Sequence, residues 1–202
     1  MTPEMQLSAP RRGRPGYDHD EVLRVAVQLF NEQGYDATSV ADLAQRLGLT
    51  KSALYHHFDS KEQLLQIALE TALSELEAAL RDAVARDEPA STQLTEVIRG
   101  AVRVLTSEQP SVTLLLRLRG NSPVELAALE RRRRFDQRVT ALVRAAQDEG
   151  LIRADVDAGV ATRLIFGMIN SLVEWYRPDG KVDPALLADD VLAMALEGLR
   201  PR

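Results

Sequence analysis

Apolar residues recur every three or four positions along most of this chain, the spacing that places them on one face of an α-helix. No stretch alternates polar and apolar residues as a strand would, and no segment is repeated. Glycine, proline, serine and threonine interrupt the pattern and mark the expected helix ends. The pattern predicts helices over residues 18 or 20 to 33, 38–47, 51–57, 60–86, 91–105, 112–118, 123–149, 158–176 and 184–199. The sequence therefore predicts an all-α fold.

The predicted helix 51–57 is unusually short and lies between two longer ones. Thr50 can cap its first turn, and Ser60 with Gln63 has the form of a capping box that opens the next helix. A helix of about two turns is not stable alone in water, so neighbouring helices must support it. Its apolar side carries Leu54 and Phe58. Its polar side carries Lys51, Ser52, Tyr55 and His56.

The turn at Gly48-Leu49 places this short helix directly after the predicted helix 38–47. Two helices joined in this way form a helix-turn-helix, whose second helix enters the major groove of DNA. The helix before them supplies the third wall of a small core. We therefore expect a three-helix DNA-binding domain over residues 18–64 and a larger helical domain for ligand binding and dimerisation over residues 65–202.

Three runs carry a family resemblance: Ala37–Ala44, Leu47–Phe58 and Ser60–Leu65. From about Val22 to Leu65 the chain resembles, without a gap, the DNA-binding domain of the tetracycline-repressor (TetR) family. The strings Leu-Tyr-x-His-Phe and Lys-Glu-x-Leu are specific to that family. The resemblance implies an all-α homodimer that binds a palindromic double-stranded DNA operator. It also implies a divergent ligand domain and repression that a small-molecule effector relieves.

Candidate DNA contacts lie on the short helix and at the ends of its neighbours. Lys51 can donate to guanine and Ser52 can bind either kind of base pair, while Tyr55 can bind a phosphate or pack on a thymine methyl group. Further phosphate contacts are expected from Thr38, Ser39, His56, His57 and Lys61. The family resemblance implies that the positions matching these residues contact DNA. The alternative is that Tyr55 is only a surface ring. The residues expected to act both as helix caps and as DNA contacts are Thr38, Ser39 and Thr50.

Residues 1–17 form an expected flexible basic arm, because they contain three prolines and little periodicity. Arg12 and Arg14 belong to the run Arg-Arg-Gly-Arg-Pro. An extended Arg-Gly-Arg-Pro segment resembles an AT-hook, whose arginines enter the narrow minor groove of A·T-rich DNA. A solubilising tail is an equally good interpretation of the same residues.

Four successive arginines, Arg131–Arg134, cover more than one turn of a predicted helix, so at least one must point inward. The first two share the face of Phe135, which belongs to the expected core. A buried arginine needs an anionic partner. The preferred interpretation is an internal ion pair with Glu125 or Glu130; the other is a contact to a carboxylate or phosphate of a ligand. The candidate ligand-binding residues are Arg117, Arg131, Arg132, Phe135, Phe166 and Asn170.

The helix 158–176 and the last helix are each apolar on two faces. One face can be buried in the chain's own core, and the other needs a partner. Pairing of both helices with a second copy gives the homodimer that two operator half-sites require. Trp175–Gly180 and Leu115–Arg138 are similar to segments of TetR-type repressors that respond to acyl-CoA thioesters. The similarity implies an acyl-CoA effector; the alternative is that Trp175 and Tyr176 only complete the dimer helix.

Composition narrows the remaining possibilities. The net charge of −5 excludes a globally basic nucleic-acid coat, although the local charge is what matters for DNA binding. The absence of cysteine excludes disulfides, thiolate nucleophiles and Cys-bound metal. No segment is apolar enough to span a membrane or to act as a secretion signal, so a cytoplasmic protein is expected.

Metal binding and catalysis find little support in the sequence. Adjacent His56 and His57 point about 100° apart on a helix and cannot easily share an ion. We therefore expect no metal and no cofactor. No catalytic constellation is evident, so a regulator is expected rather than an enzyme. The alternative is a helical ligand-binding or adaptor protein without DNA-binding activity.

Overall fold

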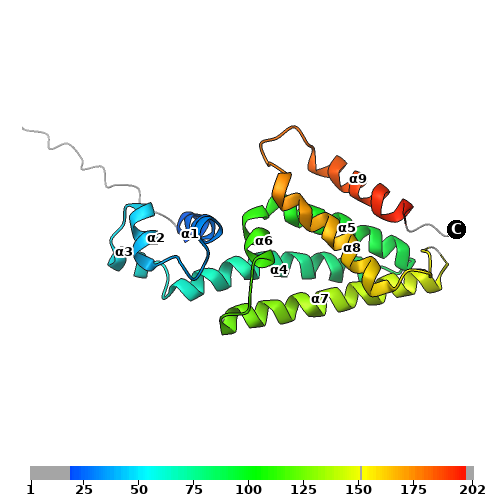
Figure 1. Cartoon of the computed structure of the whole chain (residues 1–202), viewed down its shortest axis with the longest axis horizontal. Coiled ribbons are helices and arrows are strands. Elements are labelled where there is room, and N and C mark those ends of the chain that lie inside the picture. Colours follow the sequence, from blue (N-terminus) through cyan, green and yellow to red (C-terminus); the bar gives the residue numbers. More distant parts are fainter. Residues whose placement is uncertain (1–18, 151, 199–202) are drawn as a thin grey trace, which may run out of the picture.

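The computed structural model describes residues 19–150 and 152–198, and their regular secondary structure is entirely helical. The helices are α1 (His19–Gln33), α2 (Val40–Leu47), α3 (Lys51–Tyr55), α4 (Lys61–Val84), α5 (Ala90–Ser107), α6 (Gln109–Leu116), α7 (Pro123–Asp148), α8 (Ala158–Trp175) and α9 (Pro184–Glu197). Figure 1 shows α1–α3 at one end of the molecule, joined through the long α4 to a larger bundle. The predicted all-α fold is confirmed. In the described part of the chain, no helix is long and apolar enough to cross a membrane.

Local hydrogen bonds define the helix-turn-helix as the sequence predicts. Ser39 Oγ accepts from the Asp42 N–H at 3.2 Å, and the Asp42 carboxylate accepts from the Ser39 N–H at 2.7 Å. Gly48 ends α2 in the left-handed conformation with φ of 63°. The Leu49 N–H then donates to Ala44 O at 2.9 Å, which closes the turn before α3. The order of α2, turn and α3 is therefore fixed by its own sequence.

Other helix ends differ from the sequence-based expectation. The helix α3 ends at Tyr55, and α6 begins at Gln109 with a proline in its first turn, where the missing N–H removes no helical hydrogen bond. The helix predicted over residues 91–105 begins instead at Ala90, and no side chain caps it locally. The Ala90 N–H instead donates to the carboxylate of Glu149, at 2.9 Å. A long-range partner therefore replaces the local cap.

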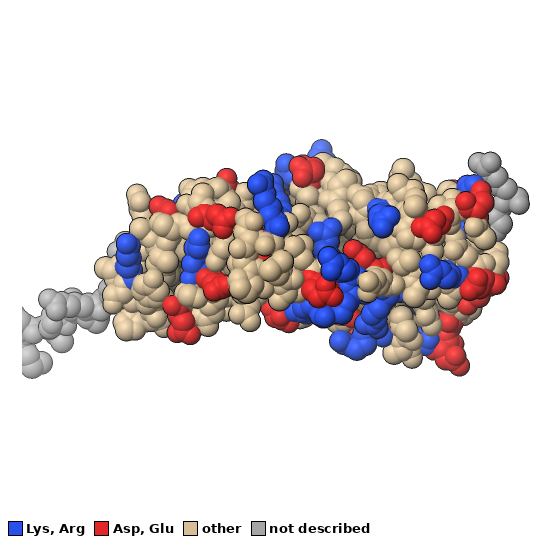
Figure 2. Space-filling model, turned by 60° about the horizontal axis from the view of Figure 1, so that its bottom comes forward, with Lys and Arg blue, Asp and Glu red and all other residues tan. Residues whose placement is uncertain are grey.

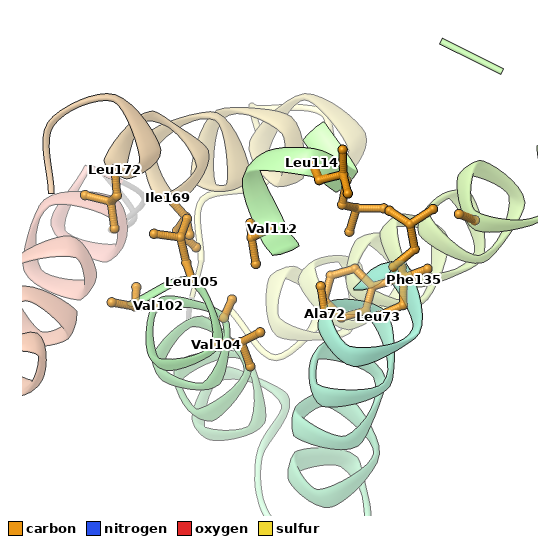
Figure 3. Close-up of a cluster of buried hydrophobic side chains, with 14 of the residues drawn as sticks. Ala72, Leu73, Val102, Val104, Leu105, Val112, Leu114, Phe135, Ile169 and Leu172 are labelled. Carbon is orange, nitrogen blue, oxygen red and sulfur yellow. The ribbon is translucent and has the colours of Figure 1, made fainter. Parts of the chain in front are cut away.

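The helix α4 is buried along much of its length. Leu64 and Leu65 are buried near its start, and Leu73 and Leu80 are buried further along it; all four belong to one continuous apolar core. Figure 3 shows apolar side chains of α4, α5, α6, α7 and α8 converging on one cluster. Its labelled members are Ala72, Leu73, Val102, Val104, Leu105, Val112, Leu114, Phe135, Ile169 and Leu172. The helix α4 is therefore packed against the bundle and continues directly into the N-terminal helices.

The short helix α6 is tied to the end of α1 by polar contacts. The Asn31 side chain donates to Pro110 O at 2.8 Å, and Arg117 donates back to Asn31 O at 2.8 Å. Just beyond α6, the Asn121 amide donates to the Asp36 carboxylate at 2.9 Å. The two domains are thus joined through α6 as well as through α4.

Candidate nucleic-acid and effector sites

The outward side of α3 carries the polar residues expected there. Lys51, Ser52, Tyr55 and His56 are exposed, with 52% of the Tyr55 side chain accessible. The opposite side is buried through Leu54 and, just after the helix, Phe58. Thr50 Oγ1 accepts from the Ala53 N–H at 3.1 Å and so caps the helix. The helix therefore presents a polar face while its apolar face anchors it.

Two of the candidate DNA contacts are used inside the protein instead. The side chain of Thr38 is only 1% exposed, and its hydroxyl donates to Gly34 O at 2.8 Å. Lys61 Nζ donates to Tyr35 O at 2.7 Å and to Thr38 O at 2.8 Å, and it lies 4.1 Å from the centre of the Tyr35 ring. The prediction that these two side chains reach phosphate is corrected: they fasten the turn before α2 to the start of α4.

The remaining candidate DNA contacts are His57, Arg12, Arg14 and Ser39. His57 is half-buried, and its ring packs edge-on against His19 at 5.4 Å, so it contributes to the packing of the small domain. Arg12 and Arg14, with the rest of the expected arm, lie outside the described residues. Ser39 is exposed at the start of α2, where a phosphate can approach the helix N-terminus.

Within residues 19–150 and 152–198 no three His, Asp or Glu side chains form a group that could hold a metal.

Positive charge is sparse on the small domain. Arg24 pairs with Glu21 at 2.6 Å, and Arg46 pairs with Glu32 at 2.8 Å. Lys61 points inward, as described above. Among the described residues up to Lys61, Lys51 is the one lysine or arginine that forms neither a hydrogen bond nor an ion pair.

A cavity of about 800 Å³ lies in the bundle between α4, α5, α6, α7 and α8. Its floor is apolar and overlaps the cluster of Figure 3 at Leu105, Val112, Phe135 and Ile169. Phe166 lines the opposite wall, and its ring packs edge-on against Phe135 at 5.4 Å. The structure thus brings three of the ligand-binding candidates, Phe135, Phe166 and Asn170, together at one cavity.

The outer rim of the cavity is cationic. Four arginines line it: Arg132, Arg133, Arg144 and Arg163. Figure 2, in which the underside of Figure 1 comes forward, shows Lys and Arg side chains gathered over the middle of the molecule. Only Arg132 of these four was expected. Arg144 could have been sought by extending its row, because Arg132, Asp136, Thr140 and Arg144 are spaced four residues apart on α7.

Arg131 does not line this cavity, because it points from α7 toward α4. It donates through Nε and Nη2 to the two carboxylate oxygens of Glu77, at 2.9 and 2.8 Å, and through Nη1 to Glu70 at 2.5 Å. An internal ion pair is therefore present, but the expected partners were wrong. Glu125 is instead buried, and its Oε2 accepts from the backbone N–H groups of residues 119, 120 and 121. Arg117 also lies away from the cavity, at the junction with α1.

Replacing Arg131 with methionine should lower the free energy of unfolding by about 1–2 kcal/mol at pH 7, since charge-assisted bonds at a partly exposed site are lost. Hydrogen bonding to Arg131 lowers the pKa of Glu77; the pKa of Glu70 is lowered first by Ser74 and then by Arg131. Because the pKa values of Glu70 and Glu77 are lower in the folded protein than in the unfolded chain, both groups stabilise the fold at pH values above their unfolded pKa. This stabilisation is lost as the pH falls through their folded pKa values.

The difference between wild type and Arg131→Met, measured by urea unfolding, should therefore shrink below about pH 4. Arg133→Met is the matched control, because Arg133 pairs only with its own-helix neighbour Glu130 at the surface. A difference that stays constant down to pH 3.5 would show that the ion pairs with α4 do not produce the effect.

Several large apolar side chains on α8 and α9 are exposed. Leu164 on α8 is 65% exposed, and Leu186 and Met194 on α9 are 63% and 71% exposed. Trp175 and Val160 extend this surface along α8. Large apolar side chains gathered on two neighbouring helices are typical of a surface that another protein covers. This is the second apolar face that the sequence predicts for these helices.

Comparison with known proteins identifies both parts of the chain. The family model of the bacterial regulatory proteins of the tetR family matches residues 22–67, and the model of the tetracyclin repressor-like C-terminal domain matches residues 87–199. The HTH-type transcriptional repressor KstR2 of Rhodococcus jostii (strain RHA1) is 29% identical over 186 residues, which cover 89% of each chain.

Solved structures agree with these matches. SCO3833, a TetR-family member from Streptomyces coelicolor A3, is 50% identical, with a TM-score of 0.83 over 89% of this chain and 90% of its own. The ketosteroid transcriptional regulator KstR2 of Mycobacterium tuberculosis is 26% identical, with a TM-score of 0.83 over 91% of this chain and 95% of its own. The chain therefore belongs to the TetR family of bacterial transcriptional regulators.

Proposed function

We propose that this regulator is a repressor that binds a palindromic operator as a homodimer and releases it when an acyl-CoA thioester binds. The proposal rests mainly on one observation: a candidate DNA-binding surface and a ligand-sized cavity are physically connected within one chain. The exposed polar face of α3 is connected, through α4 and α6, to a cavity large enough for an organic ligand. In this proposal residues 18–64 form the DNA-binding domain, and residues 65–202 bind the effector and form the dimer.

The geometry of α3 supports major-groove binding. Lys51 and Ser52 stand at its first turn, exposed and pointing away from the small core, where recognition helices contact base edges. Tyr55 and His56 follow at its far end, and in this proposal they contact the DNA backbone. The name of the relative KstR2, a transcriptional repressor, supports repression as the direction of control.

A dimer through α8 and α9 is supported by their exposed apolar side chains. A homodimer that forms a four-helix bundle across a two-fold axis would cover Leu164, Leu186 and Met194 together. It would also place two copies of α3 on one side of the molecule, as two operator half-sites require.

The cavity supports an effector with an apolar body and an anionic head. Its floor can bury an acyl chain, whereas the arginines at its rim can bind the phosphates of coenzyme A. The segments Leu115–Arg138 and Trp175–Gly180, which are similar to acyl-CoA-responsive repressors, include part of the rim and the end of α8.

The short helix α6 gives a route between the two sites. Val112 and Leu115 line the cavity, while Pro110 and Arg117 at the two ends of α6 are hydrogen-bonded to Asn31 of α1. An effector that displaces α6 would therefore shift α1 and, with it, α3. Because coupling between two binding events is reciprocal, operator DNA must weaken effector binding by the same factor.

A gel-shift experiment with the DNA upstream of its own gene tests the proposal. The wild-type protein should retain this DNA at low salt, and decanoyl-CoA should release it, whereas free coenzyme A should not. Failure to retain any DNA would favour the alternative, a ligand-binding or adaptor protein. If the protein retains the DNA and no acyl-CoA of any chain length releases it, the proposed effector class is contradicted but the DNA-binding role is not.

A further inference from the structure

Apart from the arginines of the rim, two half-buried polar side chains face the effector cavity without a hydrogen-bond partner among the described residues. The Asp136 carboxylate on α7 and the Asn170 amide on α8 both line the cavity and are half-buried. Among the described residues, neither side chain forms a hydrogen bond or an ion pair. Burial raises the pKa of Asp136, while the charges of Arg132 and Arg163 act in the opposite direction. These two groups are therefore exposed only to the cavity and its rim.

The two threonines beside them, Thr140 and Thr162, already donate their hydroxyl hydrogens within the protein. Thr140 Oγ1 donates to the backbone oxygen of residue 136 at 2.8 Å and lies 3.2 Å from Thr162 Oγ1. Thr162 Oγ1 in turn donates to Ala158 O at 2.8 Å. Both hydroxyl hydrogens are thus donated within the protein, so these threonines can only accept from a ligand. A ligand that covers Asp136 and Asn170 needs partners for them, because a polar group that loses water without a new partner opposes binding.

Two contacts between α7 and α8 set the position of these groups along the cavity. Thr140 lies opposite Thr162, and Phe135 lies opposite Phe166, so the helices run antiparallel and position 132 is level with Asn170. Asp136 is one turn along α7 from that level. Asp136 and Asn170 thus stand on adjoining helices, offset by about 6 Å along the cavity. This offset matches two polar atoms of a ligand that are a few bonds apart.

We propose that the effector is a hydroxylated acyl thioester, with Asp136 accepting from a hydroxyl near the thioester and the Asn170 amide donating to the thioester carbonyl. This inference rests on the proposed acyl-CoA response and specifies its chemistry. A carboxylate next to Arg132 and Arg163 is a hydrogen-bond acceptor, so the ligand group facing it must be a donor. The carbonyl of the thioester cannot serve there, whereas a 3-hydroxyl group can.

Isothermal titration of the full-length protein with decanoyl-CoA and 3-hydroxydecanoyl-CoA tests the inference. The two probes differ by one hydroxyl group. Wild type should bind the hydroxylated thioester about 10- to 100-fold more tightly, because the plain chain leaves the Asp136 carboxylate unpaired. Asp136→Leu should reduce this preference to less than about threefold and should bind decanoyl-CoA more tightly than wild type does.

Two further variants separate this role from a general effect on the helix bundle. Asp148→Leu makes the same change at an exposed position of α7 outside the cavity, and it should keep the wild-type preference. Asn170→Leu should weaken both thioesters by a similar factor, since both carry the carbonyl.

Each outcome of the titrations decides a different claim. Equal affinity of wild type for the two probes, or a preference that survives Asp136→Leu, overturns the inference and leaves the acyl-CoA response in place. Binding of neither probe overturns the acyl-CoA response and the inference with it. The comparison on wild type needs no variant to fold, so it decides the inference by itself.

Discussion

Replacing Lys51 and Tyr55 together by alanine is expected to lower the affinity for operator DNA by at least about 1000-fold. Each side chain that binds a base or phosphate contributes about 1–3 kcal/mol, and a dimer on a palindromic site loses every contact twice. Four contacts are therefore lost per operator. Fluorescence anisotropy with labelled operator at a fixed salt concentration measures the change.

The structure supplies the controls for this experiment. Both side chains are exposed, so the double variant should unfold at the wild-type temperature. Lys181→Ala removes the same charge from an exposed loop after α8 and should bind operator as wild type does. Unchanged operator affinity in the folded double variant would show that α3 is not the recognition helix.

Salt dependence separates the two roles that Lys51 can have. If its side chain binds guanine, Lys51→Ala should relax the preference for operator over unrelated DNA and leave the salt slope nearly unchanged. If it binds phosphate, the variant should weaken both kinds of DNA and reduce the slope of log affinity against log salt by about one per subunit.

Placing glutamate at both Leu164 and Met194 is expected to convert the protein into monomers and to lower operator affinity about 100-fold or more. These side chains are 65% and 71% exposed, so the substitutions leave the fold of the single chain intact. Across a two-fold axis, however, each new carboxylate would be buried near another. A monomer contacts only one half-site, so it loses the affinity gained when two linked subunits bind one operator, which is typically about 10²–10⁴-fold.

Sedimentation velocity measures the first effect, and anisotropy with full and half operators measures the second. Val84→Glu, at an exposed apolar position near the end of α4, is the control and should remain dimeric. The variant should bind a half operator as well as wild type does, since α3 is unchanged. A dimer that persists after both substitutions would place the subunit interface elsewhere.

The features that could be predicted from the sequence are those that depend on neighbours along the chain. The capping pair Ser39 and Asp42, and the left-handed Gly48, are fixed by hydrogen bonds over three to five residues. Apolar spacing likewise placed Leu54 and Phe58 in the core and left Tyr55 outside.

The side chains that were misplaced have partners on distant elements. Lys61 bonds to carbonyls more than 20 residues earlier, and Arg131 bonds to glutamates more than 50 residues earlier. Helical periodicity shows that a charged residue faces the interior, but not which helix lies opposite it. The same limit hid Asp136, because its place at the cavity depends on how α8 packs against α7.

The scarcity of free positive charge on the small domain bears on how the regulator finds its target. Sequence-independent attachment to DNA grows with the number of phosphates that a protein neutralises. With Arg24, Arg46 and Lys61 engaged within the chain, Lys51 is left to supply that attraction from the described part of this domain. The described part of this domain is therefore expected to add little to attachment at the roughly 10⁶ or more competing sites of a chromosome.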